Sequence, residues 1–279
     1  MNIKINRDAL LKPLTNVASI VERKHALPIL SNILIQGKDG QVKLTATDLE
    51  MQVSLSFKAD LKEEIATTIS ARKFFDITRS LPDDCVIDIA IKDSRVSVKA
   101  NKSRFAIQTL PAKDYPVMTK ASSEAVVITI SQIQLKRLLK QVEFAMAQQD
   151  IRYYLNGLLF EVNGNQLNIV GTDGHRLSFT SIHLDQNYNK TEVILPRKTV
   201  IELIKLLNET EELVSVELYK GQVSFNFNDI QLISKVIDGK FPDYTRVIPE
   251  GHNNQFTIDR VQFLRSEEHT SELQSPVPI

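Results

Sequence analysis

The chain repeats itself, and an internal repeat fixes the size of the unit that has to fold. Four short segments of the first half recur in the same order in the second half, roughly 125 residues later. The matching pairs are Asn32–Ile35 with Asn156–Phe160, Leu44–Leu49 with Ile169–Gly174, Ala71–Phe75 with Pro196–Val200, and Lys113–Pro116 with Phe241–Tyr244. This period is far longer than that of a solenoid and fits a small domain of roughly 100–150 residues. The sequence therefore predicts two domains of one fold, at residues 1–125 and 126–253.

A third copy of the unit begins near the end of the chain. Asn6–Leu14 opens the first unit, Ser131–Leu139 opens the second, and Ile258–Leu264 is similar to both. We therefore expect residues 254–265 to start a third domain. Residues 266–279 have no helical or strand period and resemble the translation of a sequencing-library adapter, so they are predicted to be a non-native tail. A native but divergent tail is the alternative.

Composition narrows the class of protein. Lys plus Arg and Asp plus Glu are equal, at 34 each, whereas a domain that holds nucleic acid by charge alone is usually strongly basic. No stretch reaches the roughly 18 apolar residues of a membrane helix, and the N-terminus has no signal segment. The single cysteine, Cys85, lies in an apolar run and is expected to be a buried strand residue. We expect a cytoplasmic protein without an internal disulfide.

Each unit is predicted to contain two helices. The first helix of each unit carries apolar residues at helical spacing, such as Leu10, Leu14 and Val17. Three capping features mark where helices begin. They are a capping box of Ser131 with Gln134, Ser70 before a helix at Arg72–Leu81, and Pro196 at the first turn of a helix at Arg197–Leu207.

Between the helices the apolar period changes to two, as in Gln41–Thr45 and Gln222–Phe227, which indicates strands. Asp39-Gly40 and Asn163-Gly164 are hairpin-turn signals at matching places in the two units. The predicted fold class is α+β, with two helices packed on antiparallel sheet in each repeated domain.

Basic residues gather on the predicted helices, while acidic runs such as Asp60–Glu64 and Glu209–Glu212 lie elsewhere. The basic positions are Arg7, Lys12, Arg72, Lys73, Arg79, Lys136, Arg137, Lys140, Arg197, Lys198 and Lys205. These charges could simply solvate the outer faces of the helices. If the helices of successive domains line one surface, the same charges would attract phosphates.

Four segments together resemble a known family, the bacterial DNA polymerase III β subunit, or sliding clamp. They are Ala71–Ile77, Gln149–Gly157, Thr172–Leu177 and Asp238–Tyr244, and the resemblance extends over residues 1–265. It implies a DNA-clamp fold with three like domains per chain. Two chains would join first domain to third into a homodimeric ring around duplex DNA, with helices lining the hole. The activity would be topological and non-catalytic, without cofactor or metal. The chain also lacks the Gly-x-x-x-x-Gly-Lys-Ser/Thr loop of ATP-driven loaders.

The resemblance also implies three sets of site residues. Sequence-independent DNA contacts would come from Lys24, Arg72, Gln149, Tyr153, Tyr154, Arg197 and Lys198. A pocket for short peptide motifs of DNA polymerase subunits, clamp loader and repair proteins would be formed by Leu155, Thr172, Gly174, His175, Arg176, Leu177, Pro242, Arg246 and Val247. The ring interface would include Phe105 and Ile107. Lys24 matches the family in charge only. Strand packing is the alternative for the two tyrosines, and a strand core is the alternative for Phe105 and Ile107.

Two other functions remain open. Asp173 and His175 could be the acid–base pair of a hydrolase, but no nucleophile accompanies them, and Asp48 repeats Asp173 without a histidine, which favours a turn-forming aspartate. The chain could also be a two-domain peptide-binding scaffold that does not encircle DNA. Because the implied third domain stops at Arg265, we expect the chain as written not to close a ring.

Overall fold

The computed structural model describes residues 2–21, 27–61, 63–92, 94–249, 251, 254 and 256–265. The chain forms two compact units, Met1–Phe241 and Pro242–Ile279. Lys24 and the predicted tail 266–279 lie outside the described residues.

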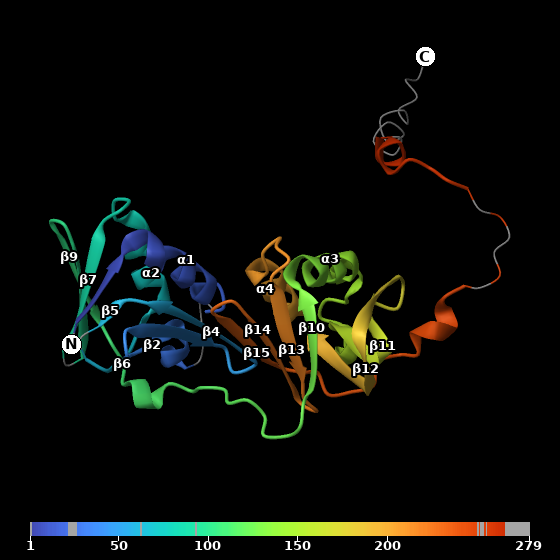
Figure 1. Cartoon of the computed structure of the whole chain (residues 1–279), viewed down its shortest axis with the longest axis horizontal. Helices are drawn as coiled ribbons and strands as arrows, with labels where there is room; N and C mark the ends of the chain where they lie inside the picture. The colour runs from blue at the N-terminus through green and yellow to red at the C-terminus, as the bar shows by residue number, and fades with distance from the viewer. Residues whose placement is uncertain are drawn as a thin grey trace, which may run out of the picture. The chain divides into compact units, whose positions relative to one another are not determined.

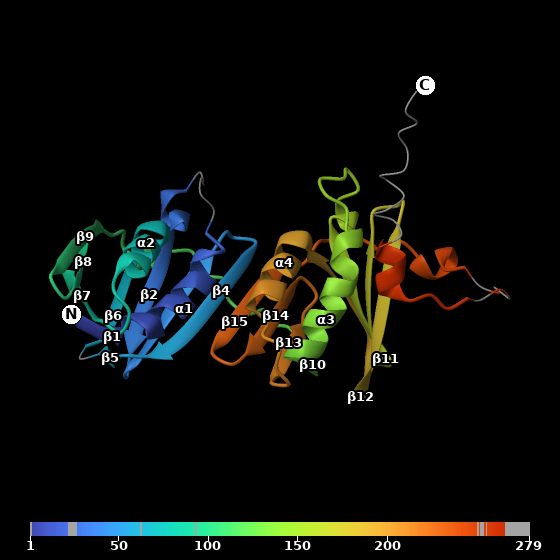
Figure 2. The same ribbon diagram turned by 90° about the horizontal axis from the view of Figure 1, so that it is seen from above.

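The first unit contains both repeats (Figures 1 and 2). The elements of the first repeat are β1 (Asn2–Asn6), α1 (Arg7–Ala18), η1 (Pro28–Ser31), β2 (Asn32–Lys38), β3 (Gln41–Thr47), β4 (Met51–Lys58), β5 (Asp60–Leu61), β6 (Ile65–Ser70), α2 (Ala71–Ser80), β7 (Val86–Lys92), β8 (Arg95–Ala100), β9 (Ser103–Gln108) and η2 (Ala112–Asp114). Those of the second are β10 (Val126–Ser131), α3 (Gln132–Val142), η3 (Glu143–Ala145), η4 (Tyr153–Leu155), β11 (Gly157–Thr172), β12 (Leu177–Pro196), α4 (Arg197–Leu206), β13 (Leu213–Leu218), β14 (Gln222–Phe227) and β15 (Ile230–Lys235). The second unit holds η5 (Tyr244–Val247). The α+β prediction is confirmed, with two α-helices in each repeat and antiparallel strand pairs.

The two repeats share one sheet. Its strand order is β10-β13-β14-β15-β4-β3-β2-β6, so β15 of the second repeat pairs with β4 of the first. We call this β15–β4 pair the seam. A five-stranded sheet, β5-β1-β7-β8-β9, completes the first repeat, and β11 and β12 form a long two-stranded ribbon in the second. Helices α1, α2, α3 and α4 lie on the same side of the eight-stranded sheet (Figure 1).

The hydrophobic core lies between helices and sheets and follows the predicted periodicity. Leu10, Leu14 and Val17 of α1 are buried, as are Leu135 and Leu139 of α3. Cys85 is buried as predicted, although it precedes β7 instead of lying within it. Among the described residues, no helix combines the length and apolar character needed to cross a membrane.

Each of the three matching openers starts a helix with a side-chain cap. The Asn6 side chain accepts a hydrogen bond from the backbone N–H of Asp8 (2.8 Å), and the Ser131 hydroxyl accepts one from Gln134 N–H (3.4 Å). In the second unit, the Asp259 carboxylate accepts one from Gln262 N–H (2.9 Å), and residues 260–265 are helical. These bonds satisfy N–H groups that have no partner inside the first helical turn.

Two predictions about helix starts are wrong, and the two hairpin-turn signals differ in backbone conformation. Ser70 precedes α2, but its side chain makes no capping hydrogen bond, and Pro196 occupies the N-cap position of α4 instead of its first turn. Asp39 and Gly40 both have positive φ, as a type I′ hairpin turn requires. In the second repeat only Gly164 has a positive φ, and the pairing of β11 with β12 shifts register on either side of it. The Asn168 side chain donates to the Glu161 carboxylate (3.1 Å), so the residues before and after Asn163-Gly164 lie close together, as a reversal of the chain there requires.

Candidate DNA and peptide interfaces

The two repeats build the same turn from different sequences. In the first repeat, the Asp48 carboxylate accepts hydrogen bonds from the N–H groups of Glu50 (2.9 Å) and Met51 (2.7 Å). Thr47 adds two more, because its hydroxyl donates to the Met51 carbonyl (2.8 Å) and accepts from Leu49 N–H (3.0 Å). The backbone therefore reverses between β3 and β4 with three N–H groups and one carbonyl of the turn bonded to two short polar side chains.

In the second repeat, Asp173 accepts from His175 N–H (2.9 Å) and Arg176 N–H (3.0 Å). The Thr172 hydroxyl donates to the Arg176 carbonyl (2.8 Å) and accepts from Gly174 N–H (3.1 Å). These four bonds match those of the first repeat. Asp173 is thus a turn-forming residue, and the backbone N–H groups of His175 and Arg176 lower the pKa of its carboxyl.

The second carboxylate oxygen distinguishes the two turns. In the first repeat, Asp48 Oδ2 accepts from Lys198 Nζ of the second repeat. In the second repeat, Asp173 Oδ2 accepts from Arg176 Nε of its own turn (3.0 Å), and the Arg176 guanidinium lies over the Phe144 ring (5.6 Å). The first turn therefore joins two repeats, whereas the second presents its side chains at the surface.

A loop at Gln149–Asn156 lies against the second turn. The Asn156 side chain holds this loop by accepting from Asp150 N–H and donating to the Asp150 carbonyl, both at 2.9 Å. Arg152 makes a two-pronged contact with the Asp150 carboxylate (3.1 and 2.8 Å) and also donates to the Asp173 carbonyl (3.2 Å). The Arg152 side chain lowers the pKa of Asp150 to about 2. Sequence reasoning missed the roles of Asp150, Arg152 and Asn156, because their spacing matches no short motif.

Among the predicted DNA contacts of this loop, Gln149 and Tyr153 are exposed and Tyr154 is half-buried. Gln149 has a φ of +57°, which is uncommon outside glycine and is a feature that clusters at functional sites. Tyr153 is 58 % exposed, and its ring meets that of Tyr154 edge-on at 5.9 Å. Both tyrosines belong to the 3₁₀-helix η4, so the alternative of strand packing is wrong.

Gln149, Arg197 and Lys198 are brought together by the structure. They line a cavity of about 480 Å³ with Asn156 and Ile201. Arg197 also donates to the carbonyls of Glu143 (3.3 Å) and Met146 (3.5 Å), and Lys198 bonds to Asp48, so both basic residues have structural partners as well.

Arg72 takes the position in the first repeat that Arg197 takes in the second. It lines a separate cavity of about 550 Å³ with Ser19, Ser70 and Phe75. Its side chain is 79 % exposed and lies 3.8 Å from the Asp76 carboxylate. The structure therefore does not bring Arg72 into the cavity of Gln149, Arg197 and Lys198.

The predicted peptide pocket divides between the two compact units. In the first unit, Leu155 and Thr172 are buried, Gly174, His175 and Arg176 are exposed, and Leu177 is half-buried. Pro242, Arg246 and Val247 belong to the second unit, where each is exposed. In the part of the chain that the structure describes, no cluster of three or more His, Cys, Asp or Glu side chains could hold a metal ion.

The predicted ring interface lies on β9, the last strand of the five-stranded sheet. Ile107 is only 5 % exposed and belongs to the core of the first repeat, while Phe105 is half-buried against it. The strand-core alternative therefore fits the side chain of Ile107, and the outer edge of β9 is the feature available for contact.

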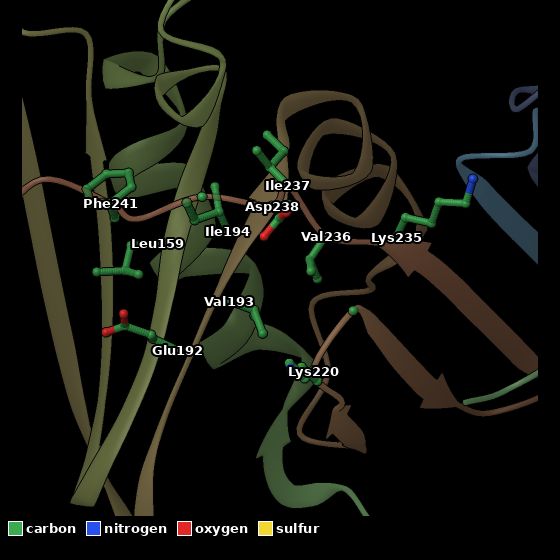
Figure 3. Close-up of a pocket in the computed structure, with 12 residues that line it drawn as sticks. Leu159, Glu192, Val193, Ile194, Lys220, Lys235, Val236, Ile237, Asp238 and Phe241 are labelled. Atoms are coloured by element: carbon green, nitrogen blue, oxygen red, sulfur yellow. The ribbon is translucent and has the colours of Figure 1, made fainter. Parts of the chain in front are cut away.

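A further cavity of about 500 Å³ lies between the β11–β12 ribbon and the end of β15 (Figure 3). Its lining includes Leu159, Val193, Ile194, Val236 and Phe241, and it contains no predicted site residue. Sequence reasoning missed it, because its walls join strand residues such as Leu159 and Val193 to segments at 220–221 and 236–241 that are distant in sequence.

Comparison with known proteins identifies the family. The DNA polymerase III beta subunit N-terminal domain matches residues 1–119, and the central domain of the same subunit matches residues 129–243. The beta sliding clamp of Pseudomonas aeruginosa is 44% identical over 264 residues, which is 94% of this chain and 72% of the relative. That of Escherichia coli K12 is 43% identical over 251 residues, or 90% of this chain and 68% of the relative.

Two solved structures of sliding clamps support the same family assignment. A DnaN sliding clamp of Pseudomonas aeruginosa bound to griselimycin superposes with a TM-score of 0.92 at 42% identity, covering 98% of this chain and 74% of the other. Caulobacter crescentus pol III beta gives a TM-score of 0.89 at 36% identity over 98% of this chain and 76% of the other. This chain belongs to the family of bacterial DNA polymerase III beta subunits, the beta sliding clamps.

Proposed function

We propose that the protein works as a ring that encircles duplex DNA and tethers the replicative polymerase, the clamp loader and repair proteins through a peptide pocket. Its domains in this proposal are 1–125, 126–253 and a third that starts at 254–265. The sliding-clamp family is non-catalytic, so the hydrolase alternative for Asp173 and His175 is wrong. A cytoplasmic location follows from a role in DNA replication.

The main observation in favour of a ring is the seam between the two repeats. It joins the last strand of one repeat, β15, to the fourth strand of the other, β4, in antiparallel register with Leu232 opposite Val53. The strand of the first repeat that corresponds to β15 is β9, which has no neighbour on its outer side among the described strands. A contact between unlike edges can be repeated head to tail, and it gives a ring when the rotation closes.

This equivalence supports the ring interface at Phe105 and Ile107. Phe105 holds the position on β9 that Leu232 holds on β15, and Leu232 is fully buried at the seam. A partner strand on the edge of β9 would bury the remaining surface of Phe105 in the same way. The partner in this proposal is the third domain of a second copy of the protein.

The DNA interface is supported by the placement of the helices. All four lie on one side of the shared sheet and carry most of the basic side chains named above (Figure 1). Lysine and arginine contacts to phosphate do not depend on base sequence and suit a protein that slides. We assign Arg72, Gln149, Tyr153 and Tyr154 to this interface, with Arg197 and Lys198 beside them.

The peptide pocket is supported by the comparison of the two turns. Both repeats fold the turn, and in the second repeat its residues Gly174, His175 and Arg176 are all exposed, next to the loop that holds the buried Leu155. A concave site with an apolar floor and a few polar groups suits a short peptide motif. The remaining members, Pro242, Arg246 and Val247, complete the pocket in this proposal.

The test is retention on DNA after incubation with a clamp loader and ATP. Retention on nicked circular DNA that is lost when the circle is cut supports encirclement. Equal retention on circular and linear DNA contradicts it. The assay is run on residues 1–279 as written, so it tests whether this chain encircles DNA. Binding of a labelled polymerase peptide without any retention would favour the scaffold.

A further inference from the structure

The segment that joins the two repeats runs across the seam. It begins after η2 and leads to β10, and we call residues 115–121 the strap. In Figure 1 this green segment passes along the side of the eight-stranded sheet opposite the helices. The strap therefore covers the face of the seam that the helices leave open.

The sequence of β4 reflects these two faces. Met51, Val53 and Leu55 point into the core under the helices. Gln52 and Ser54 point to the other face, because side chains alternate along a strand. Both are polar, yet each is only 2 % exposed. A buried glutamine needs hydrogen-bond partners, and the strap supplies them.

Two glutamines hold the strap, one from each repeat. Gln52 of β4 accepts from Met118 N–H (2.8 Å) and donates to the Met118 carbonyl (3.3 Å). Gln222 of β14 accepts from Ala121 N–H (2.8 Å) and donates to the Thr119 carbonyl (3.1 Å). Each side-chain amide thus bonds to one backbone donor and one backbone acceptor, much as a neighbouring strand would.

The strap is also anchored beyond the glutamines. On the side of the first repeat, the buried Tyr115 hydroxyl donates to the Asn32 carbonyl (3.2 Å). On the side of the second, Lys120 Nζ lies 2.9 Å from a Glu217 carboxylate oxygen on β13. The strap is therefore attached to both of the repeats that the seam joins.

The opposite face of the seam is held by separate contacts. Ser19 at the end of α1 donates to the Glu202 carboxylate of α4 (3.1 Å), and Lys198 bonds to Asp48. Rotation about the seam would stretch either these contacts or the strap. A joint restrained on both faces resists opening in both directions.

We propose that the strap keeps the seam closed by binding to both repeats, and that Gln52 and Gln222 are the positioning residues that hold the strap in place. The inference concerns the joint inside one chain and does not depend on the proposed ring. It assigns a mechanical role to a linker whose length and sequence show no motif.

Hydrogen exchange on the full chain tests this proposal. Two amides report directly on the seam: Ser56 N–H donates to the Asp229 carbonyl (3.0 Å), and Lys235 N–H to the Glu50 carbonyl (2.9 Å). In the double variant Gln52→Leu/Gln222→Leu, which keeps side-chain volume and removes both amides, we expect these protons and those of Met118 and Ala121 to exchange about 10-fold faster. One lost hydrogen bond accounts for a change of that size.

Two kinds of control separate the seam from the rest of the fold. The amides of Ala59, bonded to Gly40, and Gln132, bonded to Glu212, lie inside single repeats and should change by less than about twofold. The variant Gln36→Leu replaces an exposed glutamine of the same sheet, on β2, and should change none of these rates.

Faster exchange in the strap with an unchanged seam would overturn the proposal, because the strap would then be a passive cover. Unchanged exchange of Met118 and Ala121 would overturn it as well, since the glutamines would not hold the strap. If the double variant loosens the whole fold, Gln222→Leu and Lys120→Ala provide milder tests. If seam and control amides exchange faster by the same factor in both of these variants, the proposed role of the strap is also rejected.

Discussion

Asp48 offers the sharpest test of how the turn and the joint between repeats are stabilised. Its side chain is 6 % exposed, with one oxygen bonded to the N–H groups of Glu50 and Met51 and the other to Lys198. Asp48→Asn keeps an oxygen for both N–H groups and loses the ion pair. Because Lys198 is 42 % exposed, we expect that loss to cost about 1 kcal/mol.

Asp48→Ala removes the ion pair and both turn bonds together. Two charge-assisted hydrogen bonds, at about 1.5 kcal/mol each, add about 3 kcal/mol, so the total should be about 4 kcal/mol. At about 3 °C per kcal/mol, the Tm should fall by about 3 °C for Asp48→Asn and about 12 °C for Asp48→Ala. Thermal unfolding followed by circular dichroism measures both. Equal losses in the two variants would refute the reasoning, because the ion pair would then outweigh the turn.

Three further predictions rest on single residues. Burial raises the pKa of Tyr115 to about 12, so the stability that its neutral hydroxyl contributes is complete below about pH 10 and is lost as the pH rises through 12. Ultraviolet titration should show one tyrosine that ionises only near pH 12. Ser131→Ala should lower stability by about 1 kcal/mol in urea titrations, whereas Ser70→Ala, at a helix start without a side-chain cap, should change it by less than about 0.5 kcal/mol. Gly174→Leu copies Leu49 of the first repeat, so the turn should still form, but a Cβ at Gly174 lies 3.0 Å from the Arg152 guanidinium. Fluorescence anisotropy should show weaker binding of a polymerase peptide, and unchanged binding would count against the assigned pocket.

The features that depend on residues close together in the sequence could be predicted from it. The helix starts at Asn6 and Ser131 follow from short-range hydrogen bonds that the sequence displays directly. The turn-forming role of Asp173 was predictable from Asp48, because a repeat supplies an internal comparison. Burial of the α1 face followed from its helical period.

Partners that are distant in sequence were not predictable in the same way. Gln52 and Gln222 lie 170 positions apart in strands that read as ordinary alternation, and their common partner is a linker. Contacts of this kind depend on the register between repeats, which no short window of sequence contains.

The paired turns have a consequence for how such a surface can change over evolutionary time. In both repeats a threonine and an aspartate fix the same backbone turn. The three residues that follow them differ: they are Leu49, Glu50 and Met51 in the first repeat, and Gly174, His175 and Arg176 in the second. The three variable side chains can be exchanged without refolding the turn. The same hydrogen bonds therefore hold a turn with different side chains, so one copy can join two repeats while the other presents different residues at the surface.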